Sequence, residues 1–196
     1  MLTRCWWLIG GLHRNLKFGS SLPQAKVERN RSTLKVSIKL SRQWKPKAGQ
    51  YIKLSAPSLS WNTFIQWHPF VISWYEIYDE EIFIDLIIRE KRGFTALLGG
   101  KANTDREILA LIDGPYGDGI QLRGYGTVLF FASGIGVAGE LLYAKQILDD
   151  YDQRETNCRE VHLIWESNEE TGESALIEPE IQKLEAHEVG KIPLGA

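Results

Sequence analysis

The sequence predicts a β plus α/β protein, in which a small antiparallel β-barrel is followed by a partial parallel α/β domain. The barrel is indicated between residues 25 and 113 by short segments of alternating apolar residues, separated by glycine and proline turns. The α/β domain is indicated after residue 117, where apolar strands alternate with helical patterns. We therefore expect an N-terminal tail over residues 1–22, the barrel over 23–117 and the α/β domain over 123–196.

The barrel strands follow from the period of two in their apolar residues. In the segment 33–40 the apolar residues share one face; they are Leu34, Val36, Ile38 and Leu40. A strand over 67–74 contains Pro69, which predicts either an edge strand or a position where the missing N–H is useful. The remaining expected elements are strands at 51–55, 81–89 and 107–112 and a short helix at 93–98.

The α/β domain opens with a dense apolar run at 127–133, which predicts a fully buried strand. Gly134, Gly136 and Gly139 follow, and a helical pattern continues to about residue 151. A second strand is expected at 161–165 and a second helix at 173–187. Only these two clear strands are predicted, and a two-stranded parallel sheet leaves apolar surface uncovered. On this ground we expect the sequence to be truncated at both ends.

Composition limits the classes of function. Of the 196 residues, 43% are hydrophobic and 24% charged, and the formal net charge of −2 argues against a general nucleic-acid binder. Cys5, Cys158 and the scattered histidines show no metal-ligand spacing, so no metal site is predicted. The apolar stretch 5–12 is too short to cross a bilayer. Its paired tryptophans and the basic residues after it suit either the interfacial end of a membrane helix or a loosely packed tail.

The glycine pattern at 134–139 is the first candidate binding site. A strand, a glycine turn and a helix in this order direct free backbone N–H groups and a helix dipole at a phosphate. The G-x-G-x-x-G spacing therefore indicates a nucleotide site. A tight strand–helix turn without a ligand explains the same residues, and both interpretations stay open.

Four motifs give this glycine pattern a context: His68-Pro-Phe70, Gly93-Phe-Thr95, Gly114-Pro-Tyr-Gly117 and Ser133-Gly-Ile-Gly136. Their order resembles that of ferredoxin-reductase-type flavoproteins, and among these the cytosolic portion of ferric reductases and NADPH oxidases. The residues around the motifs are similar to those of ferric reductase-type transmembrane proteins of filamentous fungi. The resemblance covers about residues 25–167, and it rests on the order of the motifs more than on any one motif.

The resemblance implies an FAD site on the barrel. His68 would hydrogen-bond the phosphate or ribitol of the flavin nucleotide, and Phe70 would lie against the isoalloxazine ring. Pro69 would hold the chain rigid between them. Val71 stands where the family usually has threonine or serine, so a side-chain hydrogen bond to the flavin is lost there, and Ser73 is the nearest substitute. The alternative for His68 is a satisfied histidine at the rim of the barrel.

The resemblance assigns two further motifs to the cofactors. The backbone of Gly93, Phe94 and Thr95 and the Thr95 hydroxyl would bind the flavin pyrophosphate, while a plain helix cap by Thr95 is the alternative. The residues expected beside the nicotinamide, which also suit an interdomain turn, are Gly114, Pro115, Tyr116 and Gly117.

The glycine loop would hold the pyrophosphate of NADPH or NADH. The residues expected to do so are Ser133, Gly134, Ile135 and Gly136. The family mostly uses NADPH, whereas Glu166, Glu169 and Glu170 would disfavour a 2′-phosphate and hint at NADH.

The activity implied is that of an NAD(P)H-dependent flavin oxidoreductase of the ferric reductase type. Electrons would pass from NADPH or NADH through FAD to a haem or ferric acceptor outside this chain. Haem would be held only by a membrane domain acting as partner, and this chain would lie at the cytosolic face of the membrane. Two alternatives stay open. One is a soluble flavin reductase of the same superfamily, and the other is a non-catalytic fragment that retains the barrel.

Overall fold

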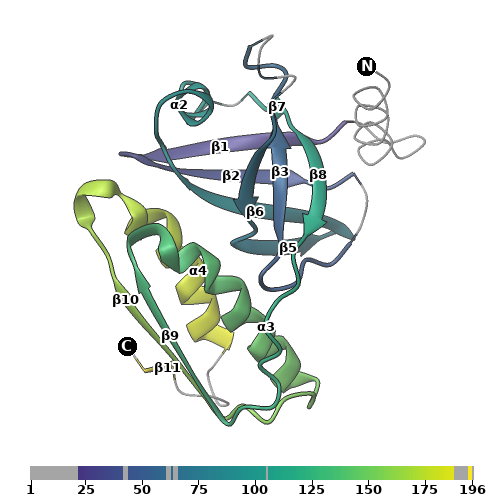
Figure 1. Ribbon diagram of the computed structural model, residues 1–196, viewed down its shortest axis with the longest axis vertical. Helices are drawn as coiled ribbons and strands as arrows, with labels where there is room; N and C mark the ends of the chain where they lie inside the picture. Colours follow the sequence, from purple (N-terminus) through teal and green to yellow (C-terminus); the bar gives the residue numbers. More distant parts are fainter. Residues whose placement is uncertain are drawn as a thin grey trace.

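The computed structural model describes residues 22–41, 44–60, 63, 66–104, 106–187 and 194–195. Cys5, the paired tryptophans and nearly all of the expected N-terminal tail lie outside the described residues. The first half of the described chain is built from antiparallel strands and a short helix. The second half is built from parallel strands and longer helices (Figure 1).

The antiparallel part consists of strands β1–β8 and helix α2 (Phe94–Gly99). The strand bounds are β1 Gln24–Asn30, β2 Thr33–Lys39, β3 Tyr51–Ser55, β4 His68–Val71, β5 Trp74–Tyr78, β6 Glu81–Arg89, β7 Ile108–Leu109 and β8 Leu111–Tyr116. A five-stranded sheet, in the order β5-β6-β2-β1-β7, faces a three-stranded sheet, β4-β3-β8. They enclose one core, in which Leu34, Val36 and Ile38 are fully buried, as the alternation in β2 predicts.

The segment 67–74, expected to be one strand, divides between the two sheets. Its first half is β4, an edge strand as Pro69 predicts, and its second half begins β5 of the other sheet. Ile72 and Ser73 connect them, and their N–H groups donate to the carbonyl oxygens of Gln50 and Asp85. Both connecting residues are buried, so the corner keeps the apolar composition of a strand and the sequence pattern does not reveal it.

The segment 107–112 divides in the same way, into β7 and β8. Strand β8 continues to Tyr116, so three of the four residues of the expected turn at 114–117 belong to the strand, and Tyr116 pairs with Tyr51 of β3. The expectation that residues 114–117 form a separate turn is therefore wrong for 114–116, which are part of β8. The residues after Tyr116 lead into the parallel part of the molecule.

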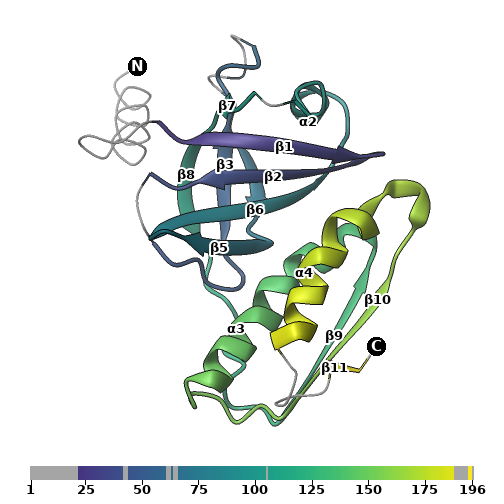
Figure 2. The ribbon, with the colours of Figure 1, turned by 180° about the vertical axis from the view of Figure 1, so that it is seen from behind.

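The parallel part runs in the order strand, helix, strand, helix, strand. Its bounds are β9 Thr127–Ser133, η2 Gly134–Gly139, α3 Leu141–Asp152, β10 Glu160–Glu166, η3 Glu169–Thr171, α4 Glu173–His187 and β11 Leu194–Gly195. β10 pairs in parallel with β9 and with β11. The expected two-stranded sheet thus gains a third, two-residue strand, which is too short to give a sequence period. Both α3 and α4 lie between this sheet and the barrel (Figures 1 and 2).

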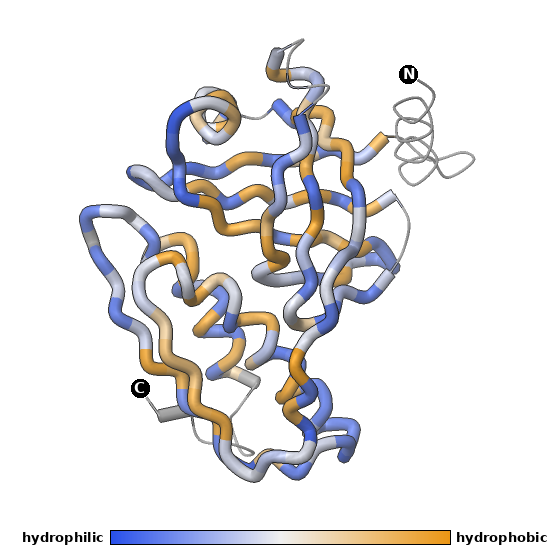
Figure 3. Tube along the Cα trace, in the orientation of Figure 1, coloured by the Kyte–Doolittle hydropathy of each residue, from blue (hydrophilic) through white to orange (hydrophobic). Residues whose placement is uncertain are grey.

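The prediction that 127–133 forms a fully buried strand is wrong. Val128 and Phe130 are buried beneath the helices, but Leu129 and Phe131 are 55% and 67% exposed. Ile164 of β10 is 48% exposed and lies beside Phe131 in the strand register. Figure 3 shows the apolar character of both strands. The cause is that α3 and α4 cover one face of the sheet, which gives β9 the alternating burial of a one-sided strand.

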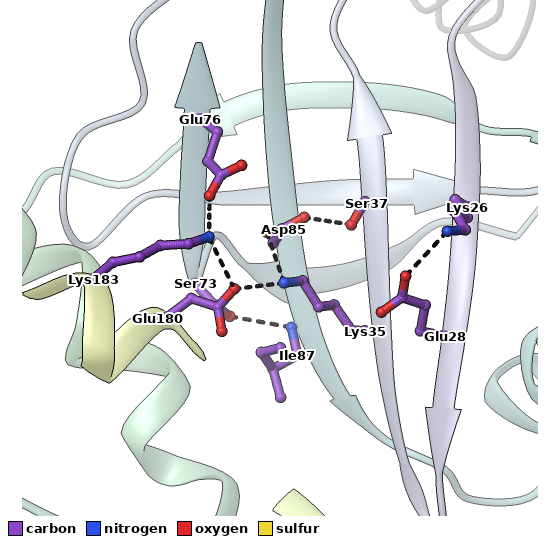
Figure 4. A network of polar contacts seen from close by, with 10 residues as sticks. All are labelled: Lys26, Glu28, Lys35, Ser37, Ser73, Glu76, Asp85, Ile87, Glu180 and Lys183. Atoms are coloured by element: carbon purple, nitrogen blue, oxygen red, sulfur yellow. Dashed lines mark hydrogen bonds and ion pairs between the residues drawn. The ribbon is translucent and has the colours of Figure 1, made fainter. Parts of the chain in front are cut away.

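Helix α4 joins the parallel part to the five-stranded sheet through buried charges (Figure 4). Lys35 Nζ of β2 lies 2.5 Å from Glu180 Oε1 of α4 and 3.4 Å from Asp85 Oδ2 of β6. The Ser37 hydroxyl donates a 2.6 Å hydrogen bond to Asp85 Oδ1. We call Lys35, Asp85 and Glu180 the Lys35 cluster. Since it joins two strands to one helix, it fixes α4 against the barrel.

Burial and ion pairing act in opposite directions on two groups of this cluster, Asp85 and Lys35. Burial raises the pKa of the Asp85 carboxyl, against the opposing effects of Lys35 and Ser37. Burial alone would lower the pKa of Lys35, but Asp85 and Glu180 outweigh it, so that the pKa of Lys35 is raised. Lys35 is therefore held as an ammonium that offsets two buried carboxyl groups.

Candidate functional site

The expected flavin site begins at the edge strand β4. His68 and Phe70 are two residues apart in this strand, so their side chains face the same side. Both rings lie against Phe94 of α2, with ring centroids 4.2 Å apart for His68 and 6.2 Å apart for Phe70. Pro69 is exposed between them. The structure thus brings together two motifs, 68–70 and 93–95, which β5 and β6 separate in the chain.

The His68 imidazole is mainly neutral at pH 7, because burial lowers its pKa below the ordinary 6.5. Its Nε2 lies 3.4 Å from Oε1 of Gln66. A neutral imidazole has one N–H donor and one acceptor nitrogen. The side chain can therefore hydrogen-bond a phosphate or hydroxyl oxygen without carrying a charge. Its role as a cofactor contact stays a prediction.

The loop before α2 combines a positive-φ glycine with open space. Gly93 has φ of +78°, and a Cβ built on it would meet no atom within 4 Å. The Thr95 hydroxyl is engaged with Lys91, accepting from its N–H at 2.7 Å and donating to its carbonyl oxygen at 3.0 Å. Thr95 therefore closes the loop locally and makes no side-chain cap of α2. The open side of Gly93 leaves room for another group to approach the backbone.

The other face of the three-stranded sheet carries a tyrosine pair. Tyr51 of β3 pairs in register with Val71 of β4 and with Tyr116 of β8. The rings of Tyr51 and Tyr116 have centroids 5.6 Å apart, and Lys53 Nζ lies 4.8 Å from the centroid of the Tyr116 ring. The Tyr116 hydroxyl donates to Asp113 Oδ2 at 2.7 Å. The sequence does not single out Tyr51 or Lys53, because their position beside the motifs depends on strand register.

The remaining motif residues of the barrel have structural roles that the contacts explain. Gly114 and Gly117 have φ of +142° and +88°, and a Cβ on Gly117 would lie 2.9 Å from the carbonyl oxygen of Gly49. Pro115 follows Gly114 through a cis peptide bond. Ser73 is fully buried, and its hydroxyl accepts the N–H of Ile87 at 3.2 Å. That hydroxyl accepts a hydrogen bond within the sheet, and its proposed role in place of the one that Val71 lacks stays a prediction.

The second expected site lies at the carboxyl end of β9. Gly134 has φ of +54°, and its carbonyl oxygen accepts a 2.8 Å hydrogen bond from Trp165 Nε1 of β10. Ser133 is exposed and Ile135 half-buried beside it. A Cβ on Gly136 would meet no atom within 4 Å. The loop is therefore fixed to the neighbouring strand at Gly134 and open at Gly136.

Arg89, the last residue of β6, links the two expected sites. A Cβ on Gly134 would lie 3.3 Å from Arg89 Nη2, and Arg89 forms an ion pair with the fully buried Glu173 at the start of α4. Gly93 follows Arg89 after one short loop. The segment 89–93 thus joins the glycine loop of the parallel part to the loop before α2. No sequence motif marks Arg89, because its partners come from two other elements.

The carboxylates expected near an adenosine group are partly described. Glu166 is exposed at the end of β10 and lies opposite Ser133 in the register. Glu170 is exposed in η3, and the side chain of Glu169 lies outside the described part. Two of the three acidic side chains are therefore free to face solvent near the carboxyl end of the parallel sheet.

Neither a metal-binding cluster nor a membrane-spanning helix is found among the described residues. No group of three or more histidine, cysteine, aspartate or glutamate side chains in the described ranges could hold a metal ion. No helix in the same ranges is long and apolar enough to cross a membrane.

An antiparallel barrel followed by a parallel α/β part defines a protein of the ferredoxin-reductase fold class. The cytochrome P450 reductase of Amycolatopsis matches over 88% of this chain and 50% of its own, with a TM-score of 0.57 and 22% identity. A flavohemoglobin from Malassezia yamatoensis with bound FAD and heme matches over 87% and 44%, with a TM-score of 0.57 and 18% identity. Phthalate dioxygenase reductase matches over 89% and 51%, with a TM-score of 0.55 and 10% identity. At these identities the likeness shows the fold.

The chain belongs to the FAD-binding domain family, whose model matches residues 20–119. Among curated relatives, ferric reductase transmembrane component 5 of Saccharomyces cerevisiae is 32% identical over 154 residues. Component 3 of the same yeast is 35% identical over 119 residues. The matches cover 74% and 57% of this chain but 21% and 16% of the relatives, so the chain spans about a fifth of their length or less. The family match shows an FAD-binding domain over the barrel half of the chain.

Proposed function

We propose that this chain is the nucleotide-binding module of a ferric reductase-like oxidoreductase, which takes electrons from NAD(P)H through FAD to an acceptor outside the chain. The observation that carries the proposal is the position of Arg89 between the two expected nucleotide sites. This residue contacts the glycine loop after β9, and the chain continues from it to Gly93 and the aromatic cluster of His68, Phe70 and Phe94. A site for a flavin nucleotide and a site for a nicotinamide nucleotide are therefore adjacent.

The residues of the barrel fit FAD. Phe70 is half-buried on an edge strand and offers a flat apolar face to a ring system. His68 is a neutral hydrogen-bonding group, and the open side of Gly93 allows a pyrophosphate to reach backbone N–H groups. The Val71 side chain supplies no hydrogen bond to the flavin, so the orientation of the flavin depends on shape and on these other contacts. When bound, FAD supplies the conversion of a two-electron hydride donor into single-electron transfers.

The glycine loop fits the pyrophosphate of a nicotinamide nucleotide. A Cβ on Gly136 would meet open space, and Trp165 Nε1 donates a hydrogen bond that fixes the carbonyl oxygen of Gly134. Arg89 keeps its side chain 38% exposed while paired with Glu173, so a guanidinium edge remains for a phosphate oxygen. Glu166 and Glu170 are exposed near the same edge of the sheet and would repel a 2′-phosphate. We therefore propose NADH over NADPH as the preferred donor.

The acceptor is proposed from the relatives. The yeast proteins are named as transmembrane components of ferric reductases, and this chain aligns with part of them. On that basis the electrons go to haem in a membrane domain, and this chain lies at the cytosolic face. A flavin reductase that uses free acceptors would instead reduce small oxidants without such a domain.

The test is oxidation of NADH and NADPH by the FAD-loaded chain with ferricyanide as electron acceptor. We expect turnover that requires FAD, with a kcat/KM about tenfold or more higher for NADH, because a repelled 2′-phosphate costs on the order of 1.4 kcal/mol. Turnover that favours NADPH would contradict the donor assignment alone. No turnover with either nucleotide by protein that holds FAD would contradict the assignment of the glycine loop.

A substitution at His68 tests the flavin site. His68→Ala is expected to weaken FAD binding by about tenfold to a hundredfold, since a hydrogen bond to a charged group contributes about 1.5–3 kcal/mol. His68→Gln keeps a donor and should retain most of the affinity. His162→Ala, on the half-exposed face of β10, is the control and should leave FAD binding unchanged. Equal FAD retention by His68→Ala and His162→Ala would refute the assignment.

A further inference from the structure

A cavity of about 590 Å³ lies between strand β5 and the C-terminal turns of α3 and α4. Its volume is in the range of small-molecule sites. The whole of β5 lines it from the barrel, and Asp149 of α3 and Lys183 of α4 line it from the helices. The glycine loop precedes α3, whereas the cavity contacts the last turns of that helix. The cavity is therefore separate from the proposed nucleotide sites.

Aromatic rings and ammonium groups meet in this cavity. Lys145 Nζ lies 4.9 Å from the centroid of the Trp74 ring and 5.0 Å from that of Tyr75. Lys45 Nζ lies 5.8 Å from the Tyr75 ring. Ile77 and Tyr78 add apolar surface and are 54% and 60% exposed. One side of the cavity is therefore apolar and open to solvent, and the ammonium groups lie beside the Trp74 and Tyr75 rings.

The cations of the cavity exceed its carboxylates. Asp149 Oδ2 accepts from the Tyr75 hydroxyl at 2.9 Å and lies 3.3 Å from Lys45 Nζ. Its Oδ1 is 3.8 Å from Lys145 Nζ. The Asp149 carboxylate is therefore shared by two ammonium groups and one hydroxyl.

The second lining carboxylate, Glu76, pairs with Lys183. Lys183 Nζ also lies 3.9 Å from Glu180, which belongs to the Lys35 cluster. The three lining lysines thus face two lining carboxylates. The carboxylate paired with Lys145 is 3.8 Å away, farther than the nearest carboxylates of Lys45 and Lys183, so the charge of Lys145 is the least compensated of the three.

We propose that this cavity binds a small aromatic carboxylate, with the ring against Ile77 and Tyr78 and the carboxylate on Lys145. The ring would cover apolar surface that is exposed, and the anion would complete the charge balance around Asp149. Because β5 belongs to the barrel and Lys145 to α3, the bound compound contacts both parts of the molecule. Occupancy would therefore stabilise their association.

The probe is salicylate, titrated into the full chain by isothermal calorimetry. We expect saturable binding that salicyl alcohol, its uncharged analogue, reproduces at least about tenfold more weakly, equivalent to about 1.4 kcal/mol. Lys145→Met keeps the apolar stem and should weaken salicylate binding to a similar extent. Lys145→Arg should retain it. Lys101→Met, at an exposed lysine outside the cavity, is the matched control and should bind as the unaltered chain does.

A second variant tests the cavity without altering Lys145. Ile77→Glu places a negative charge at an exposed cavity position and should also weaken salicylate binding. Absence of saturable binding would overturn the proposal, as would equal affinity in Lys145→Met and Lys101→Met. Binding that is lost in Phe131→Lys and kept in Lys145→Met would place the compound on the exposed face of β9, and would also overturn it.

Discussion

Replacing Lys35 by methionine is expected to lower the free energy of unfolding at pH 7 by about 3–5 kcal/mol, the range for removing one partner of a buried ion pair. Asp85 and Glu180 have side chains only 10% and 2% exposed, so water cannot replace the lost ammonium. The two carboxylates would then repel each other across the junction of β6 and α4. Urea unfolding monitored by circular dichroism measures the loss.

The loss should depend on pH in a defined direction. Burial already raises the pKa of Asp85, and without the opposing charge of Lys35 this pKa rises further above its value in the unfolded chain, so the folded state binds the Asp85 proton more tightly. Stability of the variant is therefore expected to recover as pH falls from 7 toward about 4–5. A deficit that stays constant over this range would contradict the electrostatic explanation.

Lys39→Met is the matched control for this prediction. Lys39 lies on the same strand and pairs with Glu81, but both side chains are almost half exposed. An exposed pair of this kind contributes about 0–1 kcal/mol. If Lys35→Met and Lys39→Met lowered the free energy of unfolding equally, the Lys35 cluster would not be what fixes α4 against the barrel.

Gly136→Val is expected to reduce kcat/KM for NADH by about a hundredfold, since hydrogen bonds to charged groups contribute about 1.5–3 kcal/mol each. Gly136 has no atom within 4 Å of a built Cβ and no positive φ, so the fold itself accommodates the valine. The added side chain would occupy the space proposed for the pyrophosphate. Stopped-flow reduction of the FAD-loaded chain measures the effect.

Gly126→Val is the control at the other end of β9. Gly126 also has open space around a built Cβ, but it precedes the strand and lies away from the glycine loop. We expect unchanged stability in both variants and unchanged reduction by NADH in Gly126→Val. Unchanged reduction in Gly136→Val would show that the nucleotide binds elsewhere.

Much of the fold follows from local sequence pattern. The alternation of Leu34, Val36 and Ile38 predicts the buried face of β2, and the segments 51–55, 81–89 and 173–187 form elements with the predicted bounds. Pro69 correctly predicts an edge strand. These features depend on residues close together in the chain, so a period or a missing N–H is sufficient evidence.

Features that depend on contacts between distant segments could not be predicted in this way. Leu129 and Phe131 have the composition of a buried strand, and only the placement of both helices on one face exposes them. The chain passes from one sheet to the other at Ile72 and Ser73. Both residues are buried, so the sequence pattern does not show this corner. Arg89 gains its relevance from Gly134 and Glu173, which lie in two other elements. Each case is decided by tertiary packing, which no local pattern records.

The most direct test of the proposed function is a titration of FAD with the purified full chain, followed by visible absorbance and flavin fluorescence. We expect a perturbed flavin spectrum and quenched fluorescence that saturate at one FAD per chain, because Phe70 would stack on the flavin ring. A flavin spectrum and fluorescence that remain those of free FAD, in the presence of excess folded protein, would contradict the account.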